Sequence, residues 1–458
     1  MAVRNFYIPP SVRNVSTKKW IDRYRLYDNI YDGYFFNHLS HNTVVMGHIG
    51  LPEEVANEKM ERWDRMYRTM HNIRPCRSIE PNMPVITSEN WMQHFGSTRV
   101  QYNYNYPAYL AYFDDQIQSE GTLETLQSHF PRVVDGMAAC ALHPIIHVGF
   151  GLEADHGGMV AEGLAAMCSM RHTIGSGTAQ WSDAADGAPG ILASSLAYLQ
   201  GAEDANLHAI AVQAASTPLY KALQIGAFQR ILLTFEDEAL PLGQSLDACP
   251  PVGLPALSTP LTTAVEEATR LISAAYLASD CEFFVLHGLT SLHATLAIIG
   301  HLQDAGQQRE ALVHWWRTVM AVLVCLNIPG LREGIVPLLD HYDAGGVAQG
   351  EGDDEGEGFW PRALELSVSC EDEHVGKVRV IYVELHACIC VLWCVVMCVM
   401  LHLPISQAVY ALWRWSTWTH VHSPGSRRLF RAAAQNQLRD NEMGGPHHNI
   451  WFKRILAG

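Results

Sequence analysis

The stretch Leu142-His-Pro-Ile-Ile-His-Val-Gly-Phe-Gly-Leu-Glu153 places two histidines in apolar sequence at the spacing of a helix. His143 and His147 stand at positions i and i+4, so a helix brings both onto one face. Pro144 suits the first helical position, which makes His143 the cap residue. Paired imidazoles on facing helices form transition-metal sites in all-helical proteins. The stretch therefore predicts a helix with His143 and His147 as metal ligands; the alternative is a cap histidine and a packed histidine.

Three further pairs occur in similar helix-like sequence. These are His38 with His41, His287 with His293, and His374 with Lys377. The chain has 23 histidines among 458 residues, more than surface solubility requires, and both metal binding and proton transfer use imidazole. Four such pairs favour a histidine-rich metal site, and the alternative is a set of unconnected core or surface histidines.

The pair His287 and His293 does not share a helix face, because six positions correspond to about 240° of rotation. One of the two is then expected to bind the metal while the other contacts the substrate or supports a ligand. We take His293 as the ligand, although the spacing leaves the choice open. His287, His38 and His41 are then the candidate catalytic residues that move a substrate proton.

His374 and Lys377 share a face at i and i+3. A lysine ammonium repels a metal cation, so Lys377 can ligate only as a neutral amine or after carbamylation by CO₂, which gives it a carboxylate. Burial beside a metal would lower its pKa and favour that reaction. The alternative is a surface lysine paired with Glu373 or Glu384.

Composition and apolar periodicity predict an all-α protein, a large single helical domain with its metal site between facing helices. Apolar residues make up 48% of the chain and charged residues 17%, which allows a large core. We expect this domain to span residues 1–422 and a C-terminal tail to span 423–458. Within the domain, residues 343–358 are acidic and glycine-rich, so we expect a disordered insertion there.

Charge and hydropathy exclude several classes of protein. The net charge of −16 argues against nucleic-acid binding, which needs a basic surface. The apolar run Ala387 to Leu401 is shorter than the roughly 20 residues needed to span a bilayer, and the N-terminus has no signal-peptide core. Eleven cysteines without paired spacing indicate a reducing compartment. We therefore expect a cytoplasmic protein without a membrane span.

Two other sequence motifs give weak support for alternative binding sites. Gly149-Phe-Gly151-x-x-Ala154 has the pattern of a dinucleotide-binding turn but lacks the strand–helix–strand context. His341-Tyr-Asp343 has the spacing of a two-histidine, one-carboxylate iron site, which normally lies on β-strands.

Several strings together resemble the questin oxidase-like family. They are His143-Pro-Ile-Ile-His147-Val-Gly-Phe-Gly-Leu-Glu153, Phe284-Val-Leu-His287-Gly-Leu-Thr-Ser-Leu-His293, Asp372-Glu-His374-Val-Gly-Lys377, Phe36-Asn-His38-Leu-Ser-His41 and Ile86-Thr-Ser-Glu-Asn-Trp91. Fungal members of that family open the central quinone ring of polyketide anthraquinones in secondary metabolism. Some are described as Baeyer–Villiger-type oxidases that use NADPH and others as non-haem iron oxygenases.

The resemblance implies an oxidoreductase that uses Fe(II) and O₂, possesses a carboxylated Lys377, and cleaves an anthraquinone. The competing hypothesis is a metal-free NADPH-dependent oxidase, or a quinone-binding protein, in which the histidines bind the quinone. A planar substrate calls for an aromatic cleft. Five tyrosines, which either line it or pack in the core, are Tyr102, Tyr104, Tyr106, Tyr109 and Tyr112.

Overall fold

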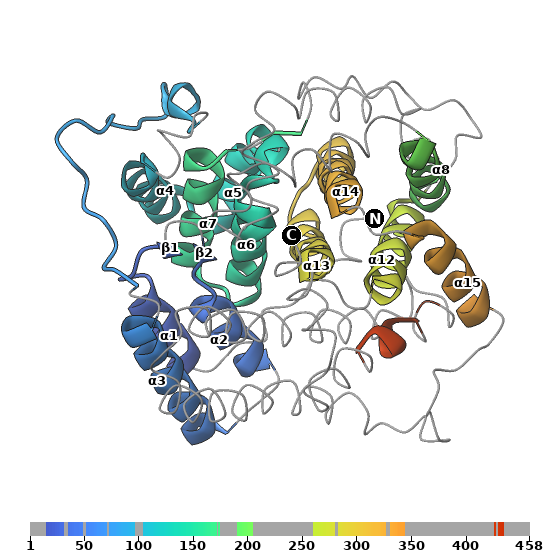
Figure 1. Ribbon diagram of the computed structural model, residues 1–458. Coiled ribbons are helices and arrows are strands. Elements are labelled where there is room, and N and C mark those ends of the chain that lie inside the picture. Colours follow the sequence, from blue (N-terminus) through green and yellow to red (C-terminus); the bar gives the residue numbers. More distant parts are fainter. Residues whose placement is uncertain are drawn as a thin grey trace, which may run out of the picture.

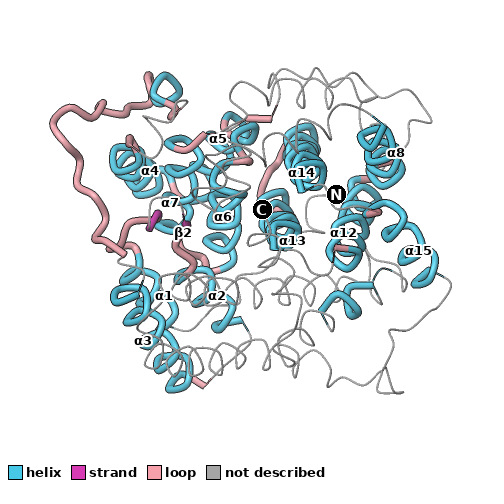
Figure 2. Tube along the Cα trace, viewed as in Figure 1, coloured by secondary structure: helices cyan, strands magenta, loops and turns pink. Residues whose placement is uncertain are grey.

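The computed structural model describes much of the chain as helix. The described residues are 15–31, 35–48, 52–70, 73–96, 104–171, 173–174, 190–204, 260–279, 283–326, 330–343, 426 and 429–434. Among them, the strands are β1 (Ile30–Tyr31) and β2 (Phe35–Phe36), a two-residue antiparallel pair. The prediction of one all-α domain is confirmed (Figures 1 and 2).

The N-terminal helices form a small layer with its own apolar cluster. They are α1 (Val15–Tyr24), α2 (Leu39–His48) and α3 (Glu53–Met70). Aromatic residues fill the cluster, among them Trp20 and Tyr67. The chain then runs along the outside of the molecule to the 3₁₀ helix η2 (Trp91–His94) (Figure 1).

The central layer contains the histidine-bearing stretch of residues 142–153. Its elements are α4 (Tyr106–Glu120), α5 (Thr122–His129), the 3₁₀ turns η3 (Phe130–Arg132), η4 (Val134–Gly136) and η5 (Ala139–Leu142), then α6 (His143–Glu153) and α7 (Gly157–Ser169). Every residue of α6 is buried. The helix lies between α7 and α13, as Figure 1 shows.

Two glycines let α6 approach its neighbours closely. A Cβ atom on Gly149 of α6 would lie 2.4 Å from the Ala294 Cβ, and one on Gly163 of α7 would lie 2.5 Å from Val148 Cγ2. Gly149 therefore sits inside a packed helix and not in a turn after a strand. This placement excludes the dinucleotide-binding interpretation of Gly149-Phe-Gly151.

The C-terminal layer completes the bundle. It contains α8 (Ile191–Asp204), α12 (Leu261–Ala278), α13 (Phe283–Ile299), α14 (Ala305–Leu326) and α15 (Leu331–Asp343). The two ends of the rival iron motif lie at the end of α15, where Asp343 forms an ion pair with Arg270 of α12. Ser426, from the expected tail, donates a hydrogen bond to Glu266 of α12.

Some sequence predictions fall outside the described residues. They concern the insertion beyond Asp343, the metal candidates His374 and Lys377, and the apolar run Ala387 to Leu401. In the part that the structure describes, no helix combines the length and hydropathy needed to cross a membrane.

Candidate active site

Three histidines from three different segments meet in the core. His38 directly precedes α2, His143 is the first residue of α6, and His287 is the fifth residue of α13. The Nε2 atom of His143 lies 2.9 Å from Nε2 of His38 and 3.3 Å from Nε2 of His287. All three side chains are buried, and one nitrogen from each lies within 4.8 Å of the others. We call this set the three-histidine cluster.

An unusual turn places His143 in the cluster. Cys140, Ala141 and Leu142 have φ values of 45°, 54° and 69°, in the left-handed region. For residues with a side chain this conformation costs about 1–2 kcal/mol each. The turn brings the Cys140 carbonyl within 2.6 Å of Nδ1 of His143. Strained backbone of this kind gathers at functional sites, where the surrounding packing enforces it.

Backbone carbonyls determine which ring nitrogens carry protons. Nδ1 of His38 donates to the Phe36 carbonyl at 2.7 Å, and Nδ1 of His143 donates to the Cys140 carbonyl. In the neutral rings, each Nε2 therefore carries a lone pair, and these two lone pairs face each other. Two acceptors cannot form a hydrogen bond.

Protonation does not resolve this contact. Burial, followed by repulsion from neighbouring histidines, lowers the pKa of His38 to about 3 and that of His143 well below its ordinary value. A bound cation between the nitrogens satisfies both lone pairs without a proton.

The spacing of the cluster fits a transition metal. With metal–nitrogen bonds of about 2.1 Å, neighbouring ligand nitrogens lie about 3.0 Å apart at octahedral angles and about 3.4 Å apart at tetrahedral angles. The two short separations, 2.9 and 3.3 Å, each lie within about 0.1 Å of one of these values. Imidazole suits iron, zinc and copper. The cluster thus has the donor type and the geometry for one such ion.

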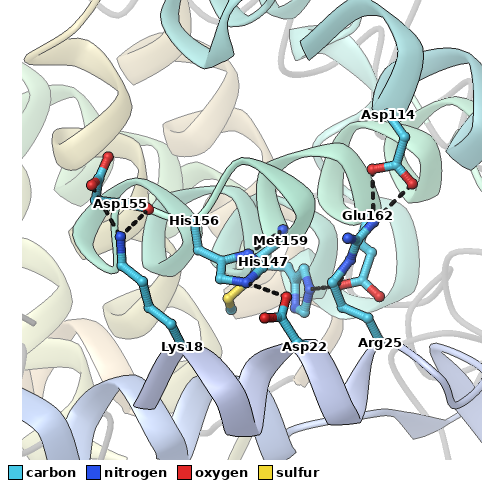
Figure 3. A network of polar contacts seen from close by, with 9 residues as sticks. All are labelled: Lys18, Asp22, Arg25, Asp114, His147, Asp155, His156, Met159 and Glu162. Carbon is cyan, nitrogen blue, oxygen red and sulfur yellow. Dashed lines mark hydrogen bonds and ion pairs between the residues drawn. The ribbon is translucent and has the colours of Figure 1, made fainter. Parts of the chain in front are cut away.

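A second polar chain begins beside the cluster. Nε2 of His41 lies 2.8 Å from Nδ1 of His147, and Nε2 of His147 lies 3.0 Å from Oε2 of Glu162 on α7. Nε of Arg25 lies 3.7 Å from the same carboxylate oxygen. Figure 3 shows His147, Glu162 and Arg25, with Asp114 of α4 on the far side of the guanidinium.

The carboxylate sets the direction of the protons along this chain. Ionised Glu162 only accepts, so His147 donates from Nε2 and accepts at Nδ1 from the Nε2–H of His41. Nδ1 of His41 then carries a lone pair, and it has no hydrogen-bond partner among the described residues. Burial, followed by repulsion from nearby histidines, lowers the pKa of His41 well below its ordinary value, so its ring is neutral.

A second buried carboxylate binds the other histidine of α13. Oε1 of Glu153 lies 2.5 Å from Nε2 of His293, and Oε2 lies 3.1 Å from Nε2 of His48. Burial alone would raise the pKa of Glu153, but the charge and hydrogen bonds of His293 and His48 outweigh it and lower that pKa. His293 lies about 9 Å along the helix axis from His287.

The structure thus groups the candidates differently from the sequence. It joins His143, expected as a ligand, with His38 and His287, expected as catalytic residues. The nitrogens of His147 contact Glu162 and His41, and His293 contacts Glu153. The ligand roles of His147 and His293 stay predictions from the sequence.

The site also contains two buried carboxylates that the spacing of the histidines did not predict. Glu153 and Glu162 both lie in apolar helices and are nearly inaccessible. A lone acidic residue within an apolar helix was the available signal, because a buried carboxylate needs a partner. Two of the five tyrosines pack in the core: Tyr109 donates to the Trp91 carbonyl and Tyr112 contacts His129. Tyr102 lies outside the described residues.

The family model described as questin oxidase-like matches residues 35–380. The chain belongs to the questin oxidase-like family. The matched segment contains the three-histidine cluster, both buried carboxylates, His41 and His147. A comparison with curated proteins gave no significant match. Membership of the questin oxidase-like family implies an oxidase or oxygenase.

Proposed function

We propose that this questin oxidase-like protein is a non-haem iron dioxygenase that uses O₂ to cleave the central quinone ring of a polyketide anthraquinone in fungal secondary metabolism. The observation that carries the metal proposal is the 2.9 Å separation between Nε2 of His38 and Nε2 of His143, two rings whose Nδ1 atoms both face backbone carbonyls. Family membership supports the substrate class.

In this proposal His38, His143 and His287 hold Fe(II). His374 and Lys377, the latter as a carbamate, remain the predicted further ligands. Bound iron would supply the means of reducing O₂ with electrons from the substrate. The backbone carbonyls of Phe36 and Cys140 orient two of the rings, as the outer partners of metal-bound histidines usually do.

His41 is the proposed proton acceptor. Oxidation of a hydroxylated anthraquinone proceeds more readily from the phenolate, so a neutral base near the phenol is needed. His41 is buried, and its Nδ1 has no hydrogen-bond partner among the described residues. His147 contacts Glu162 and His41 and in this proposal supports the base; His293 contacts Glu153 and supports the core.

Metal analysis with turnover tests the proposal. Protein purified without oxygen and supplied with Fe(II) is expected to bind one iron per chain and to consume O₂ with a hydroxyanthraquinone. His143→Ala and His287→Ala should lose the iron, whereas His301→Ala, just beyond α13, should retain it. Full turnover by metal-free protein with NADPH would overturn the proposal and favour the metal-free Baeyer–Villiger-type oxidase. Binding of the quinone without turnover under either condition would favour a quinone-binding protein.

A further inference from the structure

A carboxylate and two imidazoles form a continuous buried line of hydrogen-bonded groups, which ends at a ring nitrogen of the second imidazole. We call Glu162, His147 and His41 the relay. Its members come from α7, α6 and α2, and they are 5%, 4% and 0% exposed. An ion pair that serves only stability needs Glu162 and one partner. Here the hydrogen-bonded line continues to a second histidine whose far nitrogen has no partner among the described residues.

We propose that Glu162 is a positioning residue that acts through His147 to present the Nδ1 lone pair of His41 to a phenol group of the substrate. This inference rests on the proposed function, because it assigns the support of the base in that reaction. It also explains why Glu162 is buried beside His147 and why Arg25 lies next to the Glu162 carboxylate.

The relay defines one tautomer for each ring. Nε of Arg25 lies 3.7 Å from Oε2 of Glu162, and a guanidinium only donates, so the Glu162 carboxylate is the accepting end of the relay. His147 must then donate from Nε2, and His41 must donate to His147. Without the carboxylate, both rings could adopt the opposite tautomer while staying in place. The opposite tautomer would place a proton on Nδ1 of His41, the atom that has to accept one.

The proton-transfer step balances without an oxidant. The phenol O–H bond breaks, an N–H bond forms at Nδ1 of His41, and the products are a phenolate and an imidazolium. No electron leaves either group in this step. The new positive charge on His41 is stabilised through His147 by Glu162, as a buried carboxylate stabilises the imidazolium of a catalytic triad.

Packing holds the relay in place. The His41 ring stacks on Phe36 with an interplanar angle of 9° and on Phe150 with one of 25°. Gly163, next to Glu162, lets α7 lie against the Val148 segment beside His147. The ring and the carboxylate therefore have little room to reorient, which is what a preorganised base requires.

The pair of His156 and Asp22 is a matched control for the contact between Glu162 and His147. Nε2 of His156 lies 3.0 Å from Oδ1 of Asp22, the same separation as in the Glu162–His147 pair (Figure 3). Asp22 is 67% exposed. The other nitrogen of His156 accepts from the Met159 backbone N–H, so that pair leads to no further side chain.

The kinetic experiment compares Glu162→Gln with Asp22→Asn in the iron-loaded full-length protein. Glu162→Gln should lower kcat about 10²–10⁴-fold, the range expected when the support of a general base is lost, with KM and iron content within about twofold of wild type. Glu162→Asp should recover part of kcat, and Asp22→Asn should change it less than about twofold. A kcat near wild type in folded, iron-loaded Glu162→Gln would overturn the inference.

A second measurement uses no turnover. Nitrogen NMR of metal-free wild-type protein with ¹⁵N-labelled histidine should show His41 and His147 with protons on Nε2 only, the signals being assigned from their loss in His41→Leu and His147→Leu. A proton on Nδ1 of His41 would overturn the inference even if Glu162→Gln fails to fold. An iron-free, fully active wild type with the expected tautomers would instead refute the iron proposal and leave the relay standing.

Discussion

The Nε2 atom of His293 lies 2.5 Å from Oε1 of Glu153, whereas His287, six positions earlier on α13, contacts His143. One helix therefore serves two buried polar centres, one rich in nitrogen and one built on a carboxylate. The first has donors for a metal, and the second compensates a buried charge and joins α13 to α6.

Opposite effects are expected from removing the two histidines of α13. His293→Ala removes one of the two histidines that pair with Glu153, the other being His48, and loss of one member of a buried pair costs about 3–5 kcal/mol. His287→Ala should instead remove iron while lowering stability less. Urea unfolding of metal-free protein together with metal analysis checks this. If His293→Ala loses iron at unchanged stability, His293 is a ligand, as its sequence suggested.

Acid should destabilise the metal-free protein. Burial lowers the pKa values of His38, His41 and His143 from the unfolded value of 6.5, so the unfolded chain binds more protons below pH 6.5. The stabilisation is complete above pH 6.5 and decreases as pH falls towards the folded pKa, about 3 for His38. Each histidine contributes a slope of at most about 1.4 kcal/mol per pH unit.

Chelator-treated protein unfolded in urea at pH 7.5, 6.5 and 5.5 provides the measurement. The free energy of unfolding should be nearly constant between the first two values and clearly lower at the third. His41→Phe, which keeps a planar ring in the same packing position, should show a smaller decrease. Equal stability of the wild type at pH 6.5 and 5.5 would contradict the buried neutral state of the three rings.

Helix content was predictable, because the apolar residues repeat at helical spacing and charges are few. Helix starts were less predictable: Thr263 and Glu266 have the spacing of a capping box, but α12 begins at Leu261, directly after Pro260. The left-handed turn at 140–142 was beyond prediction, because residues with side chains rarely adopt that conformation.

Spacing along one helix could not select the partners of each histidine. His143 and His147 were expected to act together because they share a face. Their positions differ by about 6 Å along the helix axis, so His143 reaches His38 and His287 whereas His147 reaches His41 and Glu162. His38, His287 and His41 come from segments more than 100 positions away and Glu162 from the next helix, 15 positions on, and the periodicity within one helix reports none of them.

Lys377 offers a test of the predicted ligand set. If it binds iron as a carbamate, Lys377→Ala should abolish turnover, and a short-chain carboxylic acid should restore part of it by supplying a carboxylate. Lys377→Arg should remain inactive, because a guanidinium stays charged and does not react with CO₂. Turnover assays with and without acetate give the readout. Near-normal turnover in both variants would mean that Lys377 is a surface residue.

Close contact between α6 and α13 should be essential to the cluster. A methyl group at Gly149 would meet the Cβ and Cα of Ala294 at 2.4 and 2.5 Å. These atoms cannot move aside as the end of a flexible side chain can. Gly149→Ala should therefore lower the free energy of unfolding by about 1–3 kcal/mol, despite a helix-propensity gain of about 1 kcal/mol.

The same substitution should weaken iron binding, because moving the helices apart separates His143 from His287. Gly306→Ala is the control: Gly306 is exposed in the first turn of α14, and its added Cβ would approach a side-chain oxygen of Asp304, also exposed. That variant should keep its iron and stay within about 0.5 kcal/mol of wild-type stability. Equal stability and iron affinity in Gly149→Ala and wild type would show that the two helices do not need this contact to bring His143 and His287 together.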